Sequence, residues 1–221
     1  YIVMPSNAPQ VKIDAVKGYG GEVIICEPTL QAREATAKEI EDSKGATFLH
    51  PSNDMDVILG QGTAGKELLE DYPDLDFIFV PVGGGGLVAG TILAAKYFGH
   101  NCKVIGGEPF EVDDAYRSLL SGKIESNSST NTIADGLKTQ LGDQNFPIIQ
   151  EGIEKIVRVT EQEITESMQL IWERLKIVCE ASCAVALAAL LKEKVLFKDK
   201  KVGIIISGGN VDLSKLPFWQ Q

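Results

Sequence analysis

Four consecutive glycines at residues 83–86 separate two apolar segments of the chain. The segment before them, residues 77–82, is rich in β-branched and aromatic residues and predicts a strand, while the alanine-bearing segment 87–98 predicts a helix. Glycines let the backbone come close to a ligand, and the first turn of a helix offers N–H groups without intrahelical partners. A strand, a glycine loop and a helix in this order predict a phosphate-binding site.

The glycine loop has two other interpretations. A flexible surface turn usually has serines and polar neighbours, whereas these glycines lie between apolar segments. A dinucleotide loop is the stronger alternative, because Gly84, Gly86 and Ala89 fit the pattern G-x-G-x-x-A. Glu108 ends the next expected strand, near the place of a ribose-binding acid. No Lys-Ser or Lys-Thr pair follows the glycines, so the residues predict a phosphate without specifying its carrier.

The composition favours a protein with a small ligand. The 221 residues include 44% hydrophobic ones, which is enough for a sizeable core. The 21 basic residues are outnumbered by 31 acidic ones, and the net charge of −10 argues against binding nucleic acid or an anionic membrane. No apolar run approaches the roughly 20 residues of a membrane helix, and the start does not resemble a signal peptide.

The cysteines indicate a reducing compartment, and we expect a cytoplasmic protein. They form no C-x-x-C pair, and with only His50 and His100 available they cannot build a zinc site of the usual spacing. A pair at i and i+4 on an apolar helix belongs to a core more often than to a metal site. We therefore expect buried thiols at all four positions: Cys26, Cys102, Cys179 and Cys183.

The elements that position the glycine loop alternate between strands and helices. We expect strands at residues 1–5, 22–26, 46–49, 77–82, 103–107, 155–159 and 202–206. We expect helices at residues 8–17, 30–43, 57–69, 87–98, 113–122 and 181–196, and one that runs from a capping box at 160–163 to 174. The alternation predicts an α/β fold with an open, twisted, mostly parallel sheet flanked by helices.

A second glycine pair, Gly208 and Gly209, also follows an expected strand. Ligands bind at the carboxyl ends of the strands of such sheets, so both glycine segments are expected at the binding edge. Residues 123–132 form a polar loop rich in serine and asparagine. A soft boundary is expected near residue 53, where the first three strands end.

Five motifs together resemble the serine racemases, a group within the fold-type-II serine/threonine dehydratases that use pyridoxal 5'-phosphate. The motifs occur in order over essentially the whole chain: Gly-Gln-Gly-Thr at 60–63, Pro-Val-Gly-Gly-Gly-Gly-Leu at 81–87, Thr-Ile-Ala-Asp-Gly at 132–136, Trp-Glu-Arg-Leu-Lys at 172–176 and Ile-Ser-Gly-Gly-Asn-Val-Asp at 206–212. The resemblance implies a tryptophan-synthase-β-like fold. Residues 1–52 would be the remainder of a small mobile domain and residues 53–221 the large cofactor-binding domain.

The resemblance assigns the cofactor site residue by residue. The phosphate is expected at Gly83, Gly84, Gly85, Gly86 and Leu87. Ser207 matches the partner of the pyridine nitrogen, where a neutral hydroxyl does not force that nitrogen to be protonated, although a helix N-cap is its alternative role. Ser52 matches a further cofactor position at which the racemases carry asparagine.

The resemblance also implies a substrate side and a cation loop. Arg33, Asp135 and Thr139 match positions that line the substrate, with Arg33 a partner for the amino acid carboxylate and a surface salt bridge as its alternative. The racemases carry serine where this chain has Thr139. Two carboxylates and a carbonyl suit Mg²⁺, Mn²⁺ or Ca²⁺, and a solvated acidic turn is the alternative. These cation ligands would be Glu108, the Val112 carbonyl and Asp114.

A nucleotide effector and a dimer follow from the same resemblance. In the family ATP activates at a homodimer interface, and the matching positions here are Ala15, Tyr19, Lys176 and Asn210. Ordinary helix and turn positions are the alternative interpretation of these four residues.

The expected activity is interconversion of L- and D-serine, with β-elimination of serine to pyruvate and ammonia. A dedicated threonine or serine ammonia-lyase, an NAD-dependent dehydrogenase and a non-catalytic binding fragment are the alternatives. The family's cofactor-bearing lysine and its second base lie in two stretches that do not occur here, and both would precede Tyr1. We therefore expect the chain to be the C-terminal part of the enzyme, and we assign no catalytic residue within it.

Overall fold

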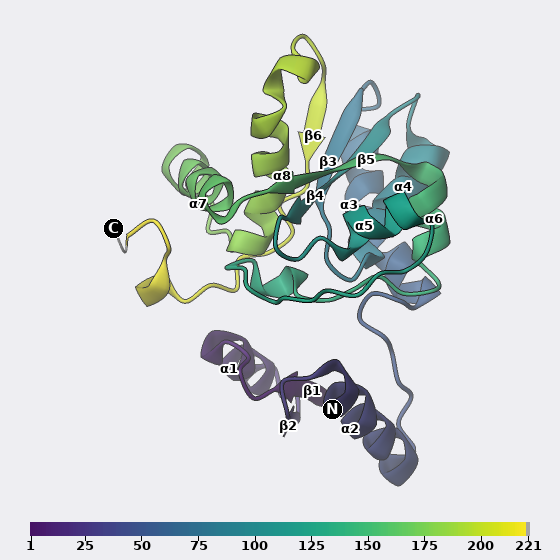
Figure 1. Ribbon diagram of the computed structural model, residues 1–221, viewed down its shortest axis with the longest axis vertical. Coiled ribbons are helices and arrows are strands. Elements are labelled where there is room, and N and C mark those ends of the chain that lie inside the picture. Colours follow the sequence, from purple (N-terminus) through teal and green to yellow (C-terminus); the bar gives the residue numbers. More distant parts are fainter. Residues whose placement is uncertain (220–221) are drawn as a thin grey trace. The chain divides into compact units, whose positions relative to one another are not determined.

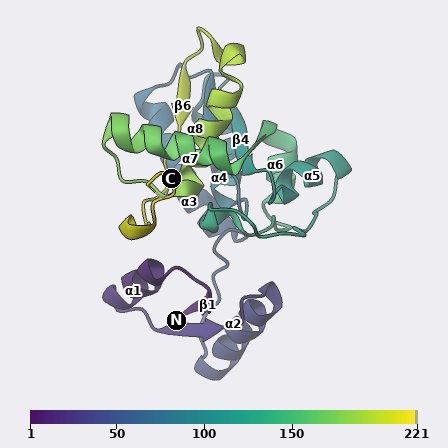
Figure 2. The ribbon, with the colours of Figure 1, turned by 60° about the vertical axis from the view of Figure 1, so that its left-hand side comes forward.

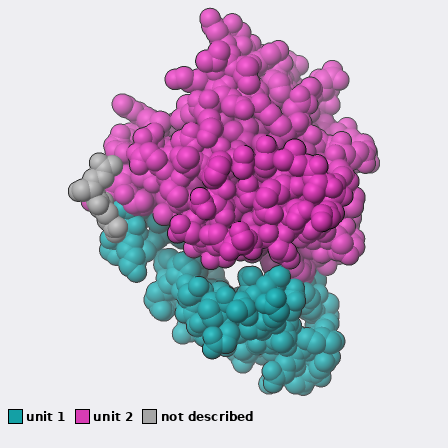
Figure 3. Space-filling view, in the orientation of Figure 1, with its two compact units in different colours: residues 1–49, 210–216 teal, residues 50–209, 217–221 magenta. Residues whose placement is uncertain are grey.

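The computed structural model describes residues 1–219 and divides into two compact units. Unit 1 comprises residues 1–49 and 210–216, and unit 2 comprises residues 50–209 and 217–219 (Figure 3). The division between residues 49 and 50 lies close to the boundary expected near residue 53. Residues 210–216 also belong to unit 1, although the sequence had placed them in the large domain, residues 53–221.

Unit 1 is built around two parallel strands. Strands β1 (Ile2–Pro5) and β2 (Val23–Cys26) pair from Ile2 opposite Val23 to Pro5 opposite Cys26, and helices α1 (Gln10–Gly18) and α2 (Leu30–Lys44) accompany them (Figure 2). The Thr29 hydroxyl caps α2 by accepting a hydrogen bond from the Ala32 N–H at 3.1 Å. These four elements confirm the expected ones, with ends shifted by one or two residues.

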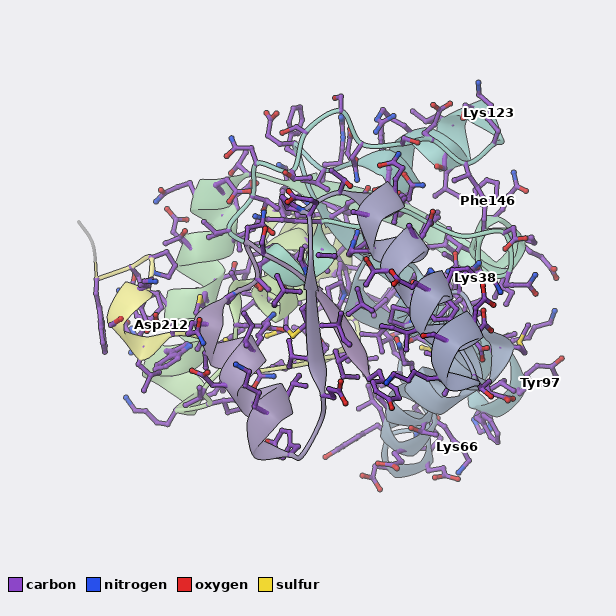
Figure 4. The ribbon with its side chains drawn as sticks, turned by 90° about the horizontal axis from the view of Figure 1, so that it is seen from below. Lys38, Lys66, Tyr97, Lys123, Phe146 and Asp212 are labelled. Carbon is purple, nitrogen blue, oxygen red and sulfur yellow. The ribbon has the colours of Figure 1, made fainter. Side chains whose placement is uncertain are left out.

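Helix α2 has a solvated outer surface. None of its residues is fully buried, and Lys38, labelled in Figure 4, lies on this helix. Its ammonium group forms ion pairs with Glu41 and Asp42. The strand expected at residues 46–49 is wrong, because this segment is irregular and its Phe48 and Leu49 are 48% and 63% exposed. A short apolar run becomes a strand only where a neighbour pairs with its backbone, and the sheet of unit 1 contains only β1 and β2 within residues 1–219.

Unit 2 contains a four-stranded parallel sheet in the order β5-β4-β3-β6. Its strands are β3 (Phe77–Pro81), β4 (Lys103–Pro109), β5 (Ile153–Val159) and β6 (Val202–Ile204). The register places Phe77 opposite both Lys103 and Val202. The expected parallel α/β sheet is confirmed, and all four strands end at the same edge.

Helices cover both faces of this sheet (Figure 1). Ile78 and Val80 of β3 join a buried cluster with residues of α3 (Met55–Asp71), α4 (Gly86–Phe98) and α6 (Phe146–Gly152). Phe79 points to the opposite face, because side chains alternate along a strand, and its ring packs on Phe197. That face carries α8 (Ala181–Lys192), which packs on β3 and β4, and α7 (Glu161–Leu170), which packs on α8.

Several helices end differently from expectation. The capping box of α7 is confirmed, but α-helical geometry stops at Leu170 and a π-helical turn, η2 (Ile171–Leu175), continues to Lys176 at φ 58°. Helix α8 ends at Lys192 and a 3₁₀ turn, η3 (Lys194–Phe197), follows. The remaining elements are α5 (Asp114–Ser121) and the 3₁₀ turns η1 (Asp135–Leu137) and η4 (Leu213–Lys215). Helix α6 was not predicted, since its seven residues are too few to show a period.

Two glycines allow α3 to approach α4 closely. A Cβ atom on Gly62 would lie 2.7 Å from the Gly90 carbonyl oxygen, and one on Gly90 would lie 2.3 Å from the Ile58 carbonyl oxygen. Real Cβ atoms essentially never approach another atom this closely, so any larger residue at either position would force the two helix backbones apart. The Gly-Gln-Gly-Thr motif thus lies on the helix that supports α4, at whose start the glycine loop lies.

The described residues contain no helix that is both long enough and apolar enough to cross a membrane.

Candidate cofactor site

The glycine loop, residues 83–86, connects the carboxyl end of β3 to the first turn of α4. The Val82 N–H donates to the Gly107 carbonyl at 2.8 Å, so the chain is held against β4 until the loop begins. Gly85 is the N-cap of α4 and has a φ of 87°, a conformation that residues with side chains rarely adopt. Its carbonyl accepts the first helical hydrogen bond, from the Ala89 N–H at 3.0 Å.

The backbone N–H groups are the main chemical feature of this loop. Within residues 1–219 the N–H groups of Gly83 to Gly86 donate no hydrogen bond, and of these four glycines only Gly84 is partly exposed. Buried N–H groups without partners are rare because they lose their hydrogen bonds to water. An anion bound at the start of α4 would satisfy them and would interact favourably with the helix dipole. The loop therefore fits a phosphate group.

Two hydroxyl groups flank the loop. A Cβ atom on Gly84 would lie 2.3 Å from the Ser52 Oγ and 3.0 Å from the Thr139 Oγ1, so both side chains approach the backbone closely. The structure thus places Ser52 and Thr139, one predicted for the cofactor and one for the substrate, beside the same glycine. Hydroxyl groups can donate to a phosphate as well as accept from the backbone.

Ser207 lies at the same edge of the sheet. It follows β6, whose neighbour β3 leads into the glycine loop, and the Ile205 N–H still donates to the Phe79 carbonyl at 3.0 Å. Ser207 is exposed and is not a helix cap, since the next turn, η4, is capped by Asp212. The helix-cap interpretation of Ser207 is therefore wrong, and its hydroxyl forms no hydrogen bond within residues 1–219.

The other two substrate-side residues lie in different units. Asp135 begins η1 in unit 2, where the neighbouring Gly136 N–H donates to the Ser182 hydroxyl at 2.9 Å. Arg33 lies half-buried on α2 of unit 1 and forms no ion pair in the part of the chain that the structure describes. The surface salt bridge considered for Arg33 is thus not formed, and its role at a substrate stays a prediction.

The acidic residues after β4 are buried. Glu108 is 1% exposed, and its two carboxylate oxygens accept hydrogen bonds from the Ala115 and Tyr116 N–H groups, both at 2.9 Å. Asp114 is also 1% exposed and accepts from the Asn127 side chain at 2.6 Å. The alternative of a solvated acidic turn is therefore wrong. Both Glu108 oxygens bind the first turn of α5, which also argues against a ribose-binding acid.

Both buried carboxyl groups have a raised pKa. Burial and the nearby Asp114 raise the pKa of Glu108 well above its usual value. Burial also raises the pKa of Asp114 to about 6. Val112, the third expected cation ligand, is fully buried beside them, and the described residues contain no cluster of three His, Cys, Asp or Glu side chains able to hold a metal. Besides the two carboxylates, a cation here would need the Val112 carbonyl and water molecules as ligands.

The four effector positions are distributed over both units. In unit 1, Ala15 lies on α1, Tyr19 follows that helix and is 90% exposed, and Asn210 is exposed. In unit 2, Lys176 follows η2 with its side chain exposed. Their role in binding a nucleotide stays a prediction.

All four cysteines are unlinked, and Cys26, Cys179 and Cys183 are buried as expected. Cys102 is half-buried instead, and burial still raises the pKa of its thiol to about 11.

The sequence reasoning missed two amides that contact the loop. The Gln61 side chain donates to the Pro51 carbonyl at 3.0 Å and lies against Gly86. The Asn145 side chain donates to the carbonyls of Ser52 and Gly84, both at 2.8 Å. Gln61 belongs to the recognised Gly-Gln-Gly-Thr motif, which could have pointed to it. Asn145 has no comparable signal, since it lies 59 residues after Gly86 in the polar segment that precedes α6.

Residues 1–208 match the profile of the pyridoxal-phosphate dependent enzyme family, and the chain therefore belongs to this family. Among curated relatives, the serine racemase of Dictyostelium discoideum is 50% identical over 98% of this chain and 68% of its own length. The beta-hydroxyaspartate dehydratase of Paracoccus denitrificans is 44% identical over 98% of this chain and 69% of its own length. The dinucleotide interpretation of the glycine loop is thus wrong.

Solved structures agree with the fold. Maize serine racemase superposes with a TM-score of 0.92 at 40% identity, covering 99% of this chain and 68% of that structure. The Dictyostelium discoideum serine racemase superposes with a TM-score of 0.87 at 51% identity, covering 96% of this chain and 69% of that structure. The chain thus spans about two thirds of the length of these relatives and has the fold-type-II architecture expected from its motifs.

Proposed function

We propose that the intact protein is a serine racemase that uses pyridoxal 5'-phosphate to interconvert L- and D-serine and also eliminates water from serine to give pyruvate and ammonia. The observation that carries this proposal is the glycine loop, whose N–H groups have no partner within residues 1–219. The phosphate of the cofactor needs such hydrogen-bond donors at the start of a helix. The 50% identity to the Dictyostelium discoideum serine racemase supports serine as the substrate.

The residues of this chain have distinct roles in the proposal. Gly83 to Leu87 hold the phosphate, and Ser52 adds a hydroxyl at its side. Bound pyridoxal phosphate supplies an electron sink that makes the α-proton of an amino acid removable. Ser207 binds the ring nitrogen with a neutral hydroxyl, which moderates that sink and suits racemisation and elimination. Arg33 binds the substrate carboxylate, while Asp135 and Thr139 line the substrate.

A dehydratase acting on another 3-hydroxy amino acid is the second candidate. The Paracoccus denitrificans beta-hydroxyaspartate dehydratase is 44% identical, and an L-threo-3-hydroxyaspartate ammonia-lyase of Saccharomyces cerevisiae is 42% identical. Threonine deaminase isoform 2 from Solanum lycopersicum also shares the fold, with a TM-score of 0.89 at 36% identity. Racemisation and dehydration both begin with removal of the α-proton and differ in the later steps.

The test uses the full-length protein with L-serine, L-threonine and 3-hydroxyaspartate in parallel. Chiral analysis measures D-serine, and coupled assays measure the keto acids formed. D-serine formation from L-serine supports the racemase. A keto acid from threonine or hydroxyaspartate without any D-serine establishes the dehydratase instead. Borohydride reduction and peptide mapping identify the lysine that carries the cofactor.

A divalent cation at Glu108, the Val112 carbonyl and Asp114 is part of the proposal. Two adjacent buried carboxyl groups are costly without a counter-charge, and Mg²⁺, Mn²⁺ or Ca²⁺ prefers such oxygen ligands. Added Mg²⁺ should raise the melting temperature of the wild type and of Glu111→Gln, whose exposed carboxylate is a matched control. An Asp114→Asn variant that responds to Mg²⁺ as the wild type does would rule this loop out.

We further propose a cytoplasmic homodimer that ATP activates through Ala15, Tyr19, Lys176 and Asn210. The exposed Tyr19 ring can stack on a base, and the Lys176 ammonium can pair with phosphates. The four unlinked cysteines suit a reducing compartment. Light scattering tests the dimer, and a Lys176→Ala variant that ATP activates as it does the wild type would contradict the effector site.

A further inference from the structure

Asn145 occupies the space beneath the glycine loop. The residue immediately precedes α6 in unit 2, and it is fully buried. The Nδ2 group donates two hydrogen bonds, to the Gly84 carbonyl and to the Ser52 carbonyl, both at 2.8 Å. The Oδ1 atom accepts from the Gly142 N–H at 3.1 Å. One side chain thus uses both of its donor hydrogens on two segments of the candidate cofactor site.

The bond to Gly84 has a consequence for the next residue. The Gly84 carbonyl and the Gly85 N–H belong to one peptide group, which is planar and trans and therefore directs them to opposite sides. Because Asn145 holds the carbonyl on its own side, the Gly85 N–H faces away from Asn145. That N–H is one of the donors without a partner within residues 1–219.

The space around Gly85 supports this orientation. A Cβ atom on Gly85 would lie 2.7 Å from the Asn145 Oδ1, so the amide lies directly against the loop. A glycine peptide at positive φ could otherwise rotate at low cost, since no side chain restricts it. We propose that Asn145 is a positioning residue that orients the Gly85 N–H toward the cofactor phosphate, an inference that rests on the proposed function.

Asn53 offers a matched control for this role. Its Oδ1 accepts from the N–H groups of Gln144 at 2.8 Å and of Asn145 at 3.4 Å, and its Nδ2 donates to Asp143 at 2.8 Å, so it holds the backbone of the same loop, residues 142–145. It forms no hydrogen bond with the glycine loop within residues 1–219. A substitution of Asn53 therefore loosens the loop without releasing the Gly84 carbonyl.

The experiment compares pyridoxal phosphate with pyridoxal, which lacks the phosphate, in the full-length protein. The variants are Asn145→Leu, which keeps the shape and removes the donors, and the control Asn53→Leu. We expect Asn145→Leu to weaken pyridoxal phosphate binding about tenfold and pyridoxal binding less than twofold, as for one lost hydrogen bond. The ³¹P chemical shift of the bound cofactor should move in this variant. Asn53→Leu should change both affinities by the same factor and leave the ³¹P shift in place.

Equal losses for pyridoxal phosphate and pyridoxal in Asn145→Leu, or no loss for either, would overturn the role of Asn145. In that case, tighter binding of pyridoxal phosphate than of pyridoxal by the wild type would still support the proposed function. A wild type that binds pyridoxal as tightly as pyridoxal phosphate would contradict both. If Asn145→Leu does not fold, Asn145→Ala, which is smaller and also removes both donor hydrogens, replaces it. An unchanged affinity ratio in that variant overturns the inference.

Discussion

At the scale of single residues, the site consists mainly of groups that the fold itself does not use. The N–H groups of the glycine loop and the Ser207 hydroxyl have no partner within residues 1–219, whereas the buried Glu108 bonds to the start of α5 with both oxygens. Groups with structural partners hold the site together, and those without partners remain available to a ligand. This distinction separates the cofactor candidates from their supports.

Ser207→Ala tests whether the Ser207 hydroxyl serves the cofactor rather than the fold. The side chain is exposed and makes no structural hydrogen bond within residues 1–219, so the free energy of unfolding of the cofactor-free protein should change by less than about 0.5 kcal/mol. Pyridoxal phosphate should bind more weakly by about 0.5–1.5 kcal/mol, the contribution of one hydrogen bond. Urea unfolding and cofactor titration measure the two effects. A variant that is destabilised without the cofactor would show that Ser207 has a structural role.

At the scale of elements, helix α3 presents two glycines to different surroundings. Apart from its chain neighbours and the backbone of its own helix, no atom of the described residues lies within 4 Å of a Cβ built on Gly60, whereas one on Gly62 would lie 2.7 Å from the Gly90 carbonyl oxygen. The same residue type thus lowers helix propensity at one position and permits helix packing at the other. Only the second has a compensating contact.

We therefore expect opposite results from the same substitution. Gly60→Ala should stabilise the protein by up to about 1 kcal/mol, because alanine favours the helix. Gly62→Ala should destabilise it by about 1–3 kcal/mol, because α3 and α4 must move apart. Thermal unfolding of the two variants side by side measures the difference. Equal effects would mean that α3 does not contact α4 through Gly62.

The start of α7 gives a prediction about pH. Burial raises the pKa of Glu163, but hydrogen bonds from Thr160 and from Lys192 outweigh that effect and hold the pKa below its usual value. A carboxylate with a lowered pKa stabilises the fold above its unfolded-state pKa, and the stabilisation is lost as the pH falls through the folded-state pKa.

Glu163→Gln should therefore cost about 0.5 kcal/mol at pH 7, where the charge interacts with the helix dipole and with Lys192. As the pH falls through the folded-state pKa of Glu163 the carboxylate becomes protonated, and the two proteins should converge in stability. Urea unfolding over a series of pH values from 7 downward measures the change. A cost that stays constant over this range would assign the effect to packing rather than to charge.

At the scale of the whole molecule, the chain forms two units with separate sheets. Unit 2 has its own buried core around β3, α3 and α4, and the candidate phosphate site lies entirely within it. The segment that precedes unit 2 is irregular, with exposed Phe48 and Leu49. Exposed segments without regular structure are the preferred sites of proteolysis.

Limited digestion with chymotrypsin should consequently cut first after Phe48 or Leu49. The larger product should keep a cooperative unfolding transition, because its core is complete. Mass spectrometry identifies the cut and circular dichroism follows the unfolding. Cleavage first after a buried aromatic residue of unit 2, such as Phe79, would contradict the division into units.

The sequence by itself determined the alternation of strands and helices and the location of the phosphate loop. Local patterns suffice for these features, because apolar runs, glycines and caps act over a few residues, as the confirmed capping box of Thr160 and Glu163 illustrates. The order of the motifs also indicated the family that the comparisons establish. The expected strand at 46–49 failed because no neighbouring strand within residues 1–219 pairs with it, which is not a local property.

Only the tertiary structure decided how distant segments meet. Residues 52, 84, 139 and 145 come together because β3 leads into a loop on which two distant segments pack, one at residue 52 and one at residues 139–145, and no local pattern encodes such contacts. Burial of Glu108 and Asp114 follows in the same way from the packing of α5 against the end of β4. The unpaired N–H groups of the glycine loop could be recognised only once the partners of the remaining backbone were known, because hydrogen-bond satisfaction is a property of the whole fold.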